Sequence, residues 1–304
     1  MKNGNAKCKI VKKLPDIKQN ICLAQYAAFK IGGRARYFFI AKTKEDIVRA
    51  IRVAKECGLP FFIFGGASNL LFADSDYEGL VIKISNQKLE DKDSTRPECG
   101  AGVILSELVN FASRNDLTGL EWAIGIPGTV GGAIRGNAGA FKSSLSEIVT
   151  EVEIYDTSKD RIKTFSYRDC QFAYRDSIFK KNPKLIILAA KFKLKKGKAA
   201  EIKKKAGEYL GHRQKTQPVG LPSAGSVFKN PDGVSAGCLI EKCGLKERKI
   251  GGAEVSAKHA NFIVNSGGAT AADVKKLMIL IKQEVKKKWK IELEEEIQVI
   301  DRMI

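Results

Sequence analysis

Residues 60–71 read PFFIFGGASNLL, and this stretch gives the first strong indication of the fold. The apolar run Pro60–Phe64 predicts a buried strand that leads directly into a loop of small residues. Small side chains allow backbone N–H groups to approach and surround an anion. The loop matches neither the G-x-G-x-x-G nor the Walker motif. Two interpretations stay open: a glycine turn after a strand, and a cradle for a diphosphate.

A second glycine-rich segment follows. Residues 125–133 read GIPGTVGGA, and residues 137–140 read NAGA. Glycine costs conformational entropy on folding, and close contact between the backbone and a flat or phosphorylated ligand commonly offsets that cost. Two such loops in one chain favour a large nucleotide cofactor. A glycine-lined turn of a β-rich domain is the alternative.

The remaining chain predicts alternating helices and strands. A capping box at Thr43–Asp46 begins a helix that ends at Gly58, and a second box at Thr270–Asp273 begins the clearest helix of the chain. The apolar stripe of that second helix predicts core packing. Further helices are predicted at residues 105–115 and 198–213, and strands at residues 60–64, 81–84, 149–155, 185–194 and 291–301.

Composition restricts the class of protein. The chain has 304 residues, of which 44% are hydrophobic, so two or three packed domains are expected. It shows no apolar run long enough for a membrane span and no secretory signal. The formal net charge of +19 allows three interpretations, namely nucleic-acid binding, attraction of anionic small molecules, or plain solvation. Because aromatic residues do not interleave with the lysines, nucleic-acid binding is not favoured.

Seven cysteines, an odd number with scattered spacing, predict free thiols in a reducing cytoplasm. The chain has only two histidines, His212 and His259, and lacks the clustered ligands of a tetrahedral metal site. We therefore expect no metal.

Residues 222–231 read PSAGSVFKNP, with Ser226 among small residues and Lys229 three positions later. The block is not the G-x-S-x-G motif of a nucleophilic serine, because Ala224 and Phe228 stand at the glycine positions. A lone serine in such a stretch is usually a turn or cap residue.

Taken together, several blocks resemble the UDP-N-acetylenolpyruvoylglucosamine reductase family, in that family's order and over about residues 27 to 301. These blocks are FKIGGRA at 29–35, GGASNLL at 65–71, GLEWAIGIPGTVGGA at 119–133, YRDS at 174–177, SAGSVFKNP at 223–231, GGA at 251–253, HANF at 259–262 and LEEEI at 293–297.

The resemblance implies an α+β fold: a two-part FAD-binding domain of the vanillyl-alcohol-oxidase (PCMH) type, followed by a smaller α/β substrate-binding domain. We expect a flexible lead-in at residues 1–20, the FAD domain at 21–197 and the substrate domain at 198–304. The FAD domain is expected to divide into parts at about 21–85 and 86–197.

The resemblance also implies the activity. Members bind FAD non-covalently and use NADPH to reduce an enolpyruvyl UDP-sugar for peptidoglycan synthesis, and thereby support cell shape and division. By similarity, the cofactor contacts are Gly65, Gly66, Ala67, Ser68, Asn69, Gly125, Ile126, Pro127, Gly128, Thr129, Gly131 and Gly132.

The catalytic set implied by the resemblance is Arg175, Ser226 and Glu296, with Ser226 as proton donor. A guanidinium suits a carboxylate with growing charge, although a surface ion pair with Asp176 is the alternative for Arg175. Glu296 is expected to be partly protonated when it faces the substrate carboxylate. Substrate contacts implied by the motifs are Tyr174, Lys215, Lys229, Asn230 and Asn261, and Lys229 is also a candidate to steady the Ser226 alkoxide.

Departures from the family pattern occur at Glu295, Asp301 and Ala27–Ala28, none of them catalytic. The chain resembles the shorter subgroup that lacks a tyrosine-bearing loop over the substrate. We expect a cytoplasmic monomer with no nucleic-acid or membrane partner. A flavin oxidase of the same fold and a basic nucleotide- or RNA-binding module are the rival hypotheses.

Overall fold

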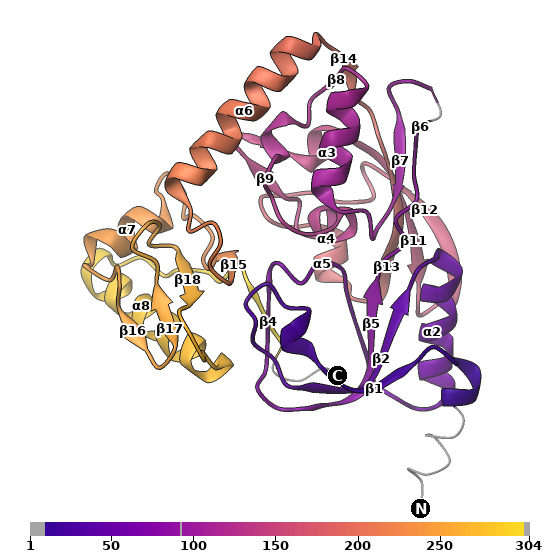
Figure 1. The fold of residues 1–304 in the computed structure, drawn as a ribbon, viewed down its shortest axis with the longest axis horizontal. Coiled ribbons are helices and arrows are strands. Elements are labelled where there is room, and N and C mark those ends of the chain that lie inside the picture. The colour runs from indigo at the N-terminus through magenta and orange to yellow at the C-terminus, as the bar shows by residue number, and fades with distance from the viewer. Residues whose placement is uncertain (1–9, 92, 301–304) are drawn as a thin grey trace, which may run out of the picture. The chain divides into compact units, whose positions relative to one another are not determined.

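The computed structural model describes residues 10–91 and 93–300, and the chain divides into two compact units (Figure 1). Unit 1 comprises Met1–Lys18, Tyr37–Gly66 and Gly79–Gly211, and unit 2 comprises Gln19–Arg36, Ala67–Glu78 and His212–Ile304. The division differs from the predicted domain boundary at residues 197–198. Two early segments pack with the C-terminal part, and most of the helix after residue 198 packs with the first part.

A five-stranded sheet, with strands in the order β12-β11-β13-β7-β6, forms the centre of unit 1 (Figure 1). All its neighbouring strands are antiparallel. The strands are β6 (Leu89–Asp91), β7 (Pro97–Gly100), β11 (Val149–Asp156), β12 (Arg161–Ser166) and β13 (Leu185–Phe192). The predicted strands at 149–155 and 185–194 are therefore confirmed to within two residues.

A four-stranded sheet has the order β1-β2-β5-β3, and its strands β2 and β5 each belong partly to both units. The strands are β1 (Lys18–Cys22), β2 (Arg34–Ala41), β3 (Phe61–Phe64) and β5 (Tyr77–Ile84). The prediction of a strand before the first glycine loop is confirmed by β3, which pairs in parallel with β5.

Helix α2 (Lys44–Glu56) follows the predicted capping box. The hydroxyl of Thr43 accepts a hydrogen bond from the Asp46 backbone N–H at 3.1 Å, and the Asp46 carboxylate accepts one from the Thr43 N–H at 3.2 Å. Gly58 takes a φ of +62° just beyond the helix end, a conformation that favours glycine. The box and the glycine together fix both ends of the helix.

The other elements of unit 1 are short, apart from α3 and α6. They are α3 (Leu105–Arg114), β8 (Leu117–Thr118), η2 (Glu121–Ala123), α4 (Val130–Arg135), β9 (Gly139–Ala140), β10 (Ser143–Ser144), η3 (Leu145–Glu147), α5 (Ile178–Lys181), β14 (Lys195–Lys196) and α6 (Ala199–Thr216), whose last turn belongs to unit 2.

Unit 2 contains a sheet with strands in the order β15-β18-β17-β16 and a parallel pair, β4 with β19. Its elements are η1 (Leu23–Gln25), β4 (Leu70–Phe72), β15 (Ser223–Ser226), α7 (Ala236–Lys242), β16 (Lys249–Ile250), β17 (Ala253–Val255), β18 (Phe262–Asn265), α8 (Ala271–Trp289) and β19 (Gln298–Ile300), together with β1 and the ends of β2 and β5.

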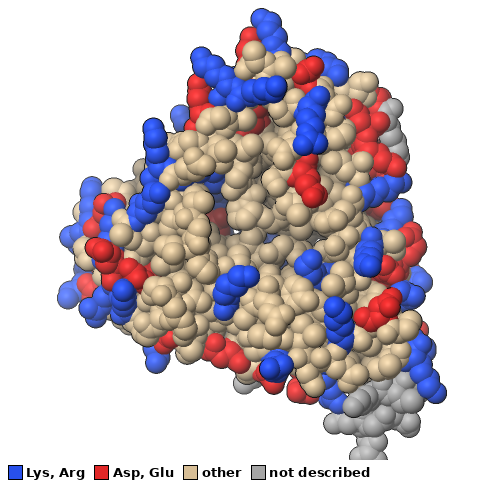
Figure 2. Space-filling model, in the orientation of Figure 1, with Lys and Arg blue, Asp and Glu red and all other residues tan. Residues whose placement is uncertain are grey.

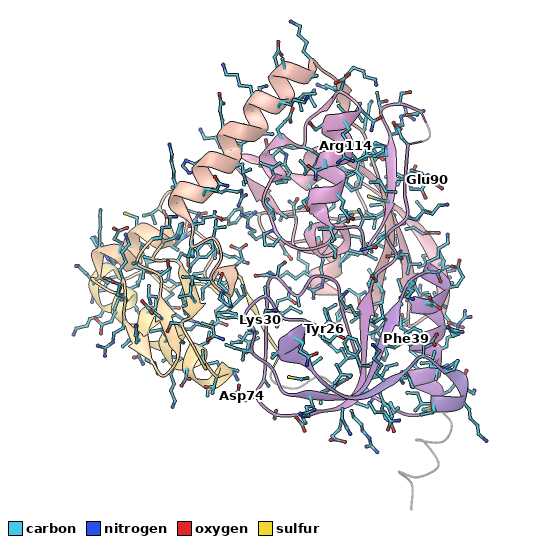
Figure 3. All side chains as sticks on the ribbon, viewed as in Figure 1. Tyr26, Lys30, Phe39, Asp74, Glu90 and Arg114 are labelled. Atoms are coloured by element: carbon cyan, nitrogen blue, oxygen red, sulfur yellow. The ribbon has the colours of Figure 1, made fainter. Side chains whose placement is uncertain are left out.

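Helix α8 confirms the second capping box, because the Thr270 hydroxyl accepts from the Asp273 N–H at 3.0 Å. Asp74, labelled in Figure 3, adds a second cap: its carboxylate accepts from the N–H groups of Ala271 and Ala272. Acidic groups stabilise the positive end of a helix dipole. The apolar stripe of α8 is buried, with Val274, Leu277, Met278, Ile281 and Val285 in the core of unit 2.

Each unit has its own hydrophobic core. The core of unit 1 includes Tyr37, Phe39 (labelled in Figure 3) and Tyr155, and that of unit 2 includes Phe29 and Phe228. Burial of side chains this large contributes about 1.5–3 kcal/mol each. Both units therefore bury enough apolar surface to hold their loops in defined positions.

Two predicted segments differ from the structure. In the part of the predicted lead-in that is described, Ile10 and Leu14 are fully buried and join the core of unit 1, while most of the other side chains are exposed; residues 1–9 lie outside the described range. The predicted strand 291–301 is a strand only at Gln298–Ile300. Its alternation is nevertheless real, because Leu293 and Ile297 are buried while Glu292 and Glu294 are exposed.

Charged side chains of both signs are interspersed on the face that Figure 2 shows, with no continuous blue stripe. Among the residues described, no helix combines the length and apolarity needed to cross a bilayer.

Candidate active site

The two glycine loops meet within unit 1. A Cβ atom added to Gly65 would overlap the hydroxyl oxygen of Thr129, and one added to Gly66 would lie 2.7 Å from the Cα of Gly128. Gly128 itself has a φ of +114°. The end of the first loop and the middle of the second are thus packed backbone against backbone, an approach that only glycine permits.

This packing gives the glycines a role within the chain itself. Gly65 and Gly66 each have a close partner in the second loop. Gly131 also has a close partner in the chain, because an added Cβ would lie 2.7 Å from the Cβ of Ala101. Gly132, in contrast, is exposed, and its added Cβ would approach nothing closer than 3.6 Å.

Thr129 is the polar centre of this junction. Its side chain is 7% exposed, and its hydroxyl has no hydrogen-bond partner among the described residues. A buried hydroxyl without a partner costs about 1–3 kcal/mol. Thr129 immediately precedes α4, a six-residue helix that the glycine content of the segment did not predict. The junction therefore carries a polar group that a bound molecule or water would satisfy.

Arg175 lies in a tight turn of unit 1. Ala173 and Asp176 exchange backbone hydrogen bonds of 3.0 and 3.2 Å across the turn, and Arg175 takes a φ of +54°. The left-handed region is unfavourable for a long side chain, and such strain is typical of functional positions. The Arg175 Nη2 donates to the Gly139 carbonyl oxygen at 2.7 Å, and its guanidinium lies 5.4 Å from the ring centroid of Tyr174.

Buried polar residues hold this turn in position. The Asn137 Nδ2 donates to the Ala173 carbonyl at 2.9 Å, and the Asn137 Oδ1 accepts from the Ser146 N–H at 3.1 Å. The Ser177 hydroxyl, completely buried, donates to the Arg135 carbonyl at 2.7 Å. These bonds join the turn to the last residue of α4 and to the segment that follows it.

The residues next to Arg175 bear on the alternative of an ion pair with Asp176. The carboxylate of Asp176, the alternative ion-pair partner, lies 3.2 Å from Lys181 Nζ. Tyr174, a predicted substrate contact, is 55% exposed. Arg175 is therefore half-buried and hydrogen-bonded, and it lies next to an exposed aromatic ring.

In unit 2, Ser226 ends β15, directly after Gly225, whose φ is +76°. A register shift between Ser223 and Ser226 interrupts the pairing of β15 with β18. Bulges of this kind turn a side chain out of the regular ladder and are common beside active sites. Ser226 therefore lies at an interruption of the β15–β18 ladder.

The segment carrying Glu296 lies beside Ser226. The Glu296 N–H donates to the carbonyl of Val227 at 2.8 Å, and the Lys229 N–H donates to the Glu294 carbonyl at 2.8 Å. Residues 226 and 296, two members of the predicted catalytic set, are thus brought together on neighbouring segments of one unit. Arg175 belongs to unit 1.

Asn261, a predicted substrate contact, is buried in unit 2 and bonded to the segment after Ser226. Its side chain is 3% exposed, its Oδ1 accepts from the Phe228 N–H at 3.0 Å, and its Nδ2 donates to the Phe228 carbonyl at 2.8 Å. The Asn261 carbonyl also accepts from the Val227 N–H at 2.8 Å. Asn261 therefore holds the segment after Ser226.

Its neighbour His259 supports Asn261 in turn. The His259 Nδ1 accepts a hydrogen bond from the Asn261 N–H at 3.2 Å. Burial lowers the pKa of the His259 imidazole from its ordinary value of 6.5. The neutral ring is thus the form that fits this position.

The other predicted substrate contacts also have partners in unit 2. The Asn230 Oδ1 accepts from the Ala236 N–H at 3.0 Å, and the Lys229 ammonium pairs with the Glu294 carboxylate. Lys215 lies in the last turn of α6. Because Lys229 is engaged by Glu294, it steadies an alkoxide at Ser226 only by sharing or leaving that ion pair.

No group of three or more metal-ligating side chains occurs within residues 10–91 and 93–300. The six cysteines in these ranges are free thiols. Sequence reasoning missed Asn137, Ser177 and the side-chain role of Asn69, described below. The available signal was that these polar residues stand inside the sequence stretches quoted above.

Comparison with known proteins agrees with this geometry. Residues 35–166 match the family model described as "FAD binding domain", and residues 217–300 match "UDP-N-acetylenolpyruvoylglucosamine reductase, C-terminal domain". The fold and the paired loops define an FAD-binding oxidoreductase, and the predicted α+β architecture with a two-part FAD domain of the vanillyl-alcohol-oxidase type is confirmed.

Full-length relatives are more specific. The chain is 37% identical to UDP-N-acetylenolpyruvoylglucosamine reductase of Clostridium novyi (strain NT), over 97% of this chain and 96% of the relative. It is 40% identical to the reductase of the same name of Caldanaerobacter subterraneus subsp. tengcongensis, over 97% of each chain. The crystal structure of the Thermus caldophilus reductase matches with a TM-score of 0.79 and 34% identity, over 92% of this chain and 97% of the other.

The chain belongs to the UDP-N-acetylenolpyruvoylglucosamine reductase family. The family predicted from the motifs is thereby confirmed, together with FAD as its cofactor and with its class of reaction.

Proposed function

We propose that this protein catalyses the NADPH-dependent, FAD-mediated reduction of UDP-N-acetylglucosamine enolpyruvate to UDP-N-acetylmuramate, in the cytoplasm and as a monomer. The observation that carries the proposal is the hydrogen bond from Glu296 N–H to Val227 O, which holds the segments of Ser226 and Glu296 side by side. Membership of the reductase family supports the substrate and the pathway.

The residues present fit the cofactor. Gly65 and Gly66 leave the junction with Gly128 free of side chains, and Thr129 offers a buried hydroxyl without a partner among the described residues. Residues 65–69 and 125–132 would hold FAD, with backbone N–H groups toward its diphosphate. When bound, FAD supplies hydride transfer from NADPH to the terminal carbon of the enol ether.

The chain's own groups handle charge and protons. As hydride adds to the terminal carbon, negative charge grows on the neighbouring carbon and its carboxylate. The Arg175 guanidinium, fixed by its bond to Gly139, would bind that carboxylate with two parallel N–H groups. Ser226 would donate its hydroxyl proton to the neighbouring carbon, which completes saturation of the double bond. Glu296 would face the same carboxylate from the adjoining segment.

Substitution of Ser226 by alanine tests the proton-donor role. Under anaerobic conditions, NADPH should still bleach the visible flavin absorbance, because that half-reaction needs no proton donor from the protein. Return of the absorbance on addition of the enolpyruvyl sugar should become at least a hundredfold slower, since general acid catalysis contributes about 10²–10⁴-fold. Equal loss in both half-reactions would reject the role.

A flavin oxidase of the same fold is the alternative enzyme. Wild-type protein that is reoxidised rapidly by oxygen but not by the enolpyruvyl sugar would favour that alternative. A colourless protein that does not take up FAD would favour a binding module without catalysis.

A further inference from the structure

Asn69 joins the first glycine loop to the C-terminal segment of unit 2. Its backbone carbonyl accepts from the Gln298 N–H at 2.9 Å, and its side-chain Nδ2 donates to the Glu296 carbonyl at 3.1 Å. The parallel pairing of β4 with β19 begins one residue later, at Leu70 with Gln298. The side chain of Asn69 therefore continues the strand ladder beyond its backbone end.

Glu296 is consequently fixed at both of its backbone groups. Its N–H donates to Val227 O, next to Ser226, and its carbonyl accepts from Asn69. Leu293 and Ile297, on either side in sequence, are buried in the core of unit 2. Because both backbone groups of Glu296 are held, its side chain starts from a fixed position from which it can reach a ligand.

We propose that Asn69 is a positioning residue for Glu296 and thereby links the cofactor loop to the substrate carboxyl site. The inference rests on the proposed function. The motif match assigned Asn69 to FAD, but its side-chain amide is directed at Glu296. The cofactor loop and the acid of the sugar half-reaction thus share one hydrogen bond that spans 227 residues of sequence.

Two substitutions test this role. Asn69→Ala removes the amide, and Asn69→Asp keeps the shape but removes the donor. Loss of one hydrogen bond corresponds to roughly a tenfold change in rate. At saturating FAD, flavin reoxidation by the enolpyruvyl sugar should slow about tenfold more than flavin reduction by NADPH. Flavin fluorescence gives the FAD dissociation constant and so detects a loss of cofactor binding. Thermal unfolding of the same samples detects a loss of the fold.

A double-substitution cycle distinguishes positioning from general damage. If Asn69 acts through Glu296, the effects of Asn69→Ala and Glu296→Gln on the sugar half-reaction should not add. Asn115→Asp is the matched control. It removes an equivalent bond, from Asn115 Nδ2 to Phe111 O at 2.8 Å, at an exposed site in unit 1, and its effect should add to that of Glu296→Gln.

Several outcomes would overturn the proposal. Additive effects of Asn69→Ala and Glu296→Gln would show that the two residues act separately. A weaker FAD affinity with both half-reactions normal at saturation would make Asn69 a cofactor contact only. A wild-type enzyme that the sugar does not reoxidise would instead refute the proposed function, so the two failures are distinguishable. If Asn69→Ala does not fold, the same criteria apply to the shape-conserving Asn69→Asp.

Discussion

The side-chain amide of Asn261 and the backbone of Phe228 form a closed pair of hydrogen bonds, 3.0 Å for N–H to Oδ1 and 2.8 Å for Nδ2–H to O. Both residues are almost fully buried. Asn261 thus replaces a strand partner at the point where the chain leaves the ladder after Ser226. The segment that follows Ser226 is therefore held by a residue that lies far from it in sequence.

Asn261→Ala should lower the free energy of unfolding by about 2–4 kcal/mol, because it leaves the buried N–H and C=O of Phe228 without partners. Urea denaturation monitored by circular dichroism measures the change. Asn115→Ala, which removes a single exposed bond, serves as the control and should cost less than about 1 kcal/mol. A loss of less than 1 kcal/mol for Asn261→Ala would contradict the structural role.

Stability should fall as the pH decreases from about 7.5 to about 5.5, partly through His259. Burial lowers the pKa of His259 in the folded state, so the unfolded chain takes up the proton first. Protonation therefore favours unfolding and removes the acceptor of the Asn261 N–H. In His259→Gln the melting temperature should change less over this range. A variant with the same pH dependence as the wild type would exclude His259 as the cause.

Gly65→Ala should weaken FAD binding and lower stability, because its methyl group overlaps the Thr129 hydroxyl. Adding Thr129→Ala should restore part of the stability, since the nearest remaining Thr129 atom, its Cβ, would lie 3.2 Å away. Fluorescence titration with FAD and thermal melts measure both effects.

Gly207→Ala is the matched control for this pair. Gly207 lies in α6 with nothing within 4 Å of an added Cβ, so the change should stabilise the protein by about 0.5–1 kcal/mol. A destabilised control, or a double variant no better than Gly65→Ala, would contradict the packing argument.

Arg175→Lys should raise KM for the enolpyruvyl sugar and lower kcat by at least tenfold, while flavin reduction by NADPH is less affected. Lysine cannot present two parallel N–H groups to a carboxylate. Steady-state and single-turnover kinetics measure the two half-reactions. Lys181→Met removes the ion pair with Asp176 next to the turn and should change the kinetics by less than threefold. Equal effects from both variants would favour a purely structural role for Arg175.

Sequence rules that depend on neighbouring residues, such as the capping box, correctly predicted the elements that carry such signals. The two capping boxes located the start of α2 and of α8, because side chain, backbone and first turn lie within four residues. The helix α4 was missed, because Gly131 and Gly132 lower its propensity and the contact of Gly131 with Ala101 comes only from the fold. Packing outweighs propensity at such a site.

The motifs predicted which residues belong to the candidate site, but they did not predict how these residues are arranged in space. The motifs identified Ser226 and Glu296, but the bonds that join their segments connect distant parts of the chain. The same limit applies to Asn261, because no local pattern in the sequence indicates its hydrogen bonds to Phe228. Contacts between residues that lie so far apart in the chain leave no periodic pattern in a single sequence.

The interleaved division of the two units has a consequence for synthesis. The chain passes between the units after residues 18, 36, 66, 78 and 211, and the partner of β4 is β19, at the far end of the chain. A nascent polypeptide emerging from the ribosome must therefore keep Leu70–Phe72 unpaired until nearly all of it has been translated. Premature termination anywhere before residue 298 would leave that edge open to association with other chains.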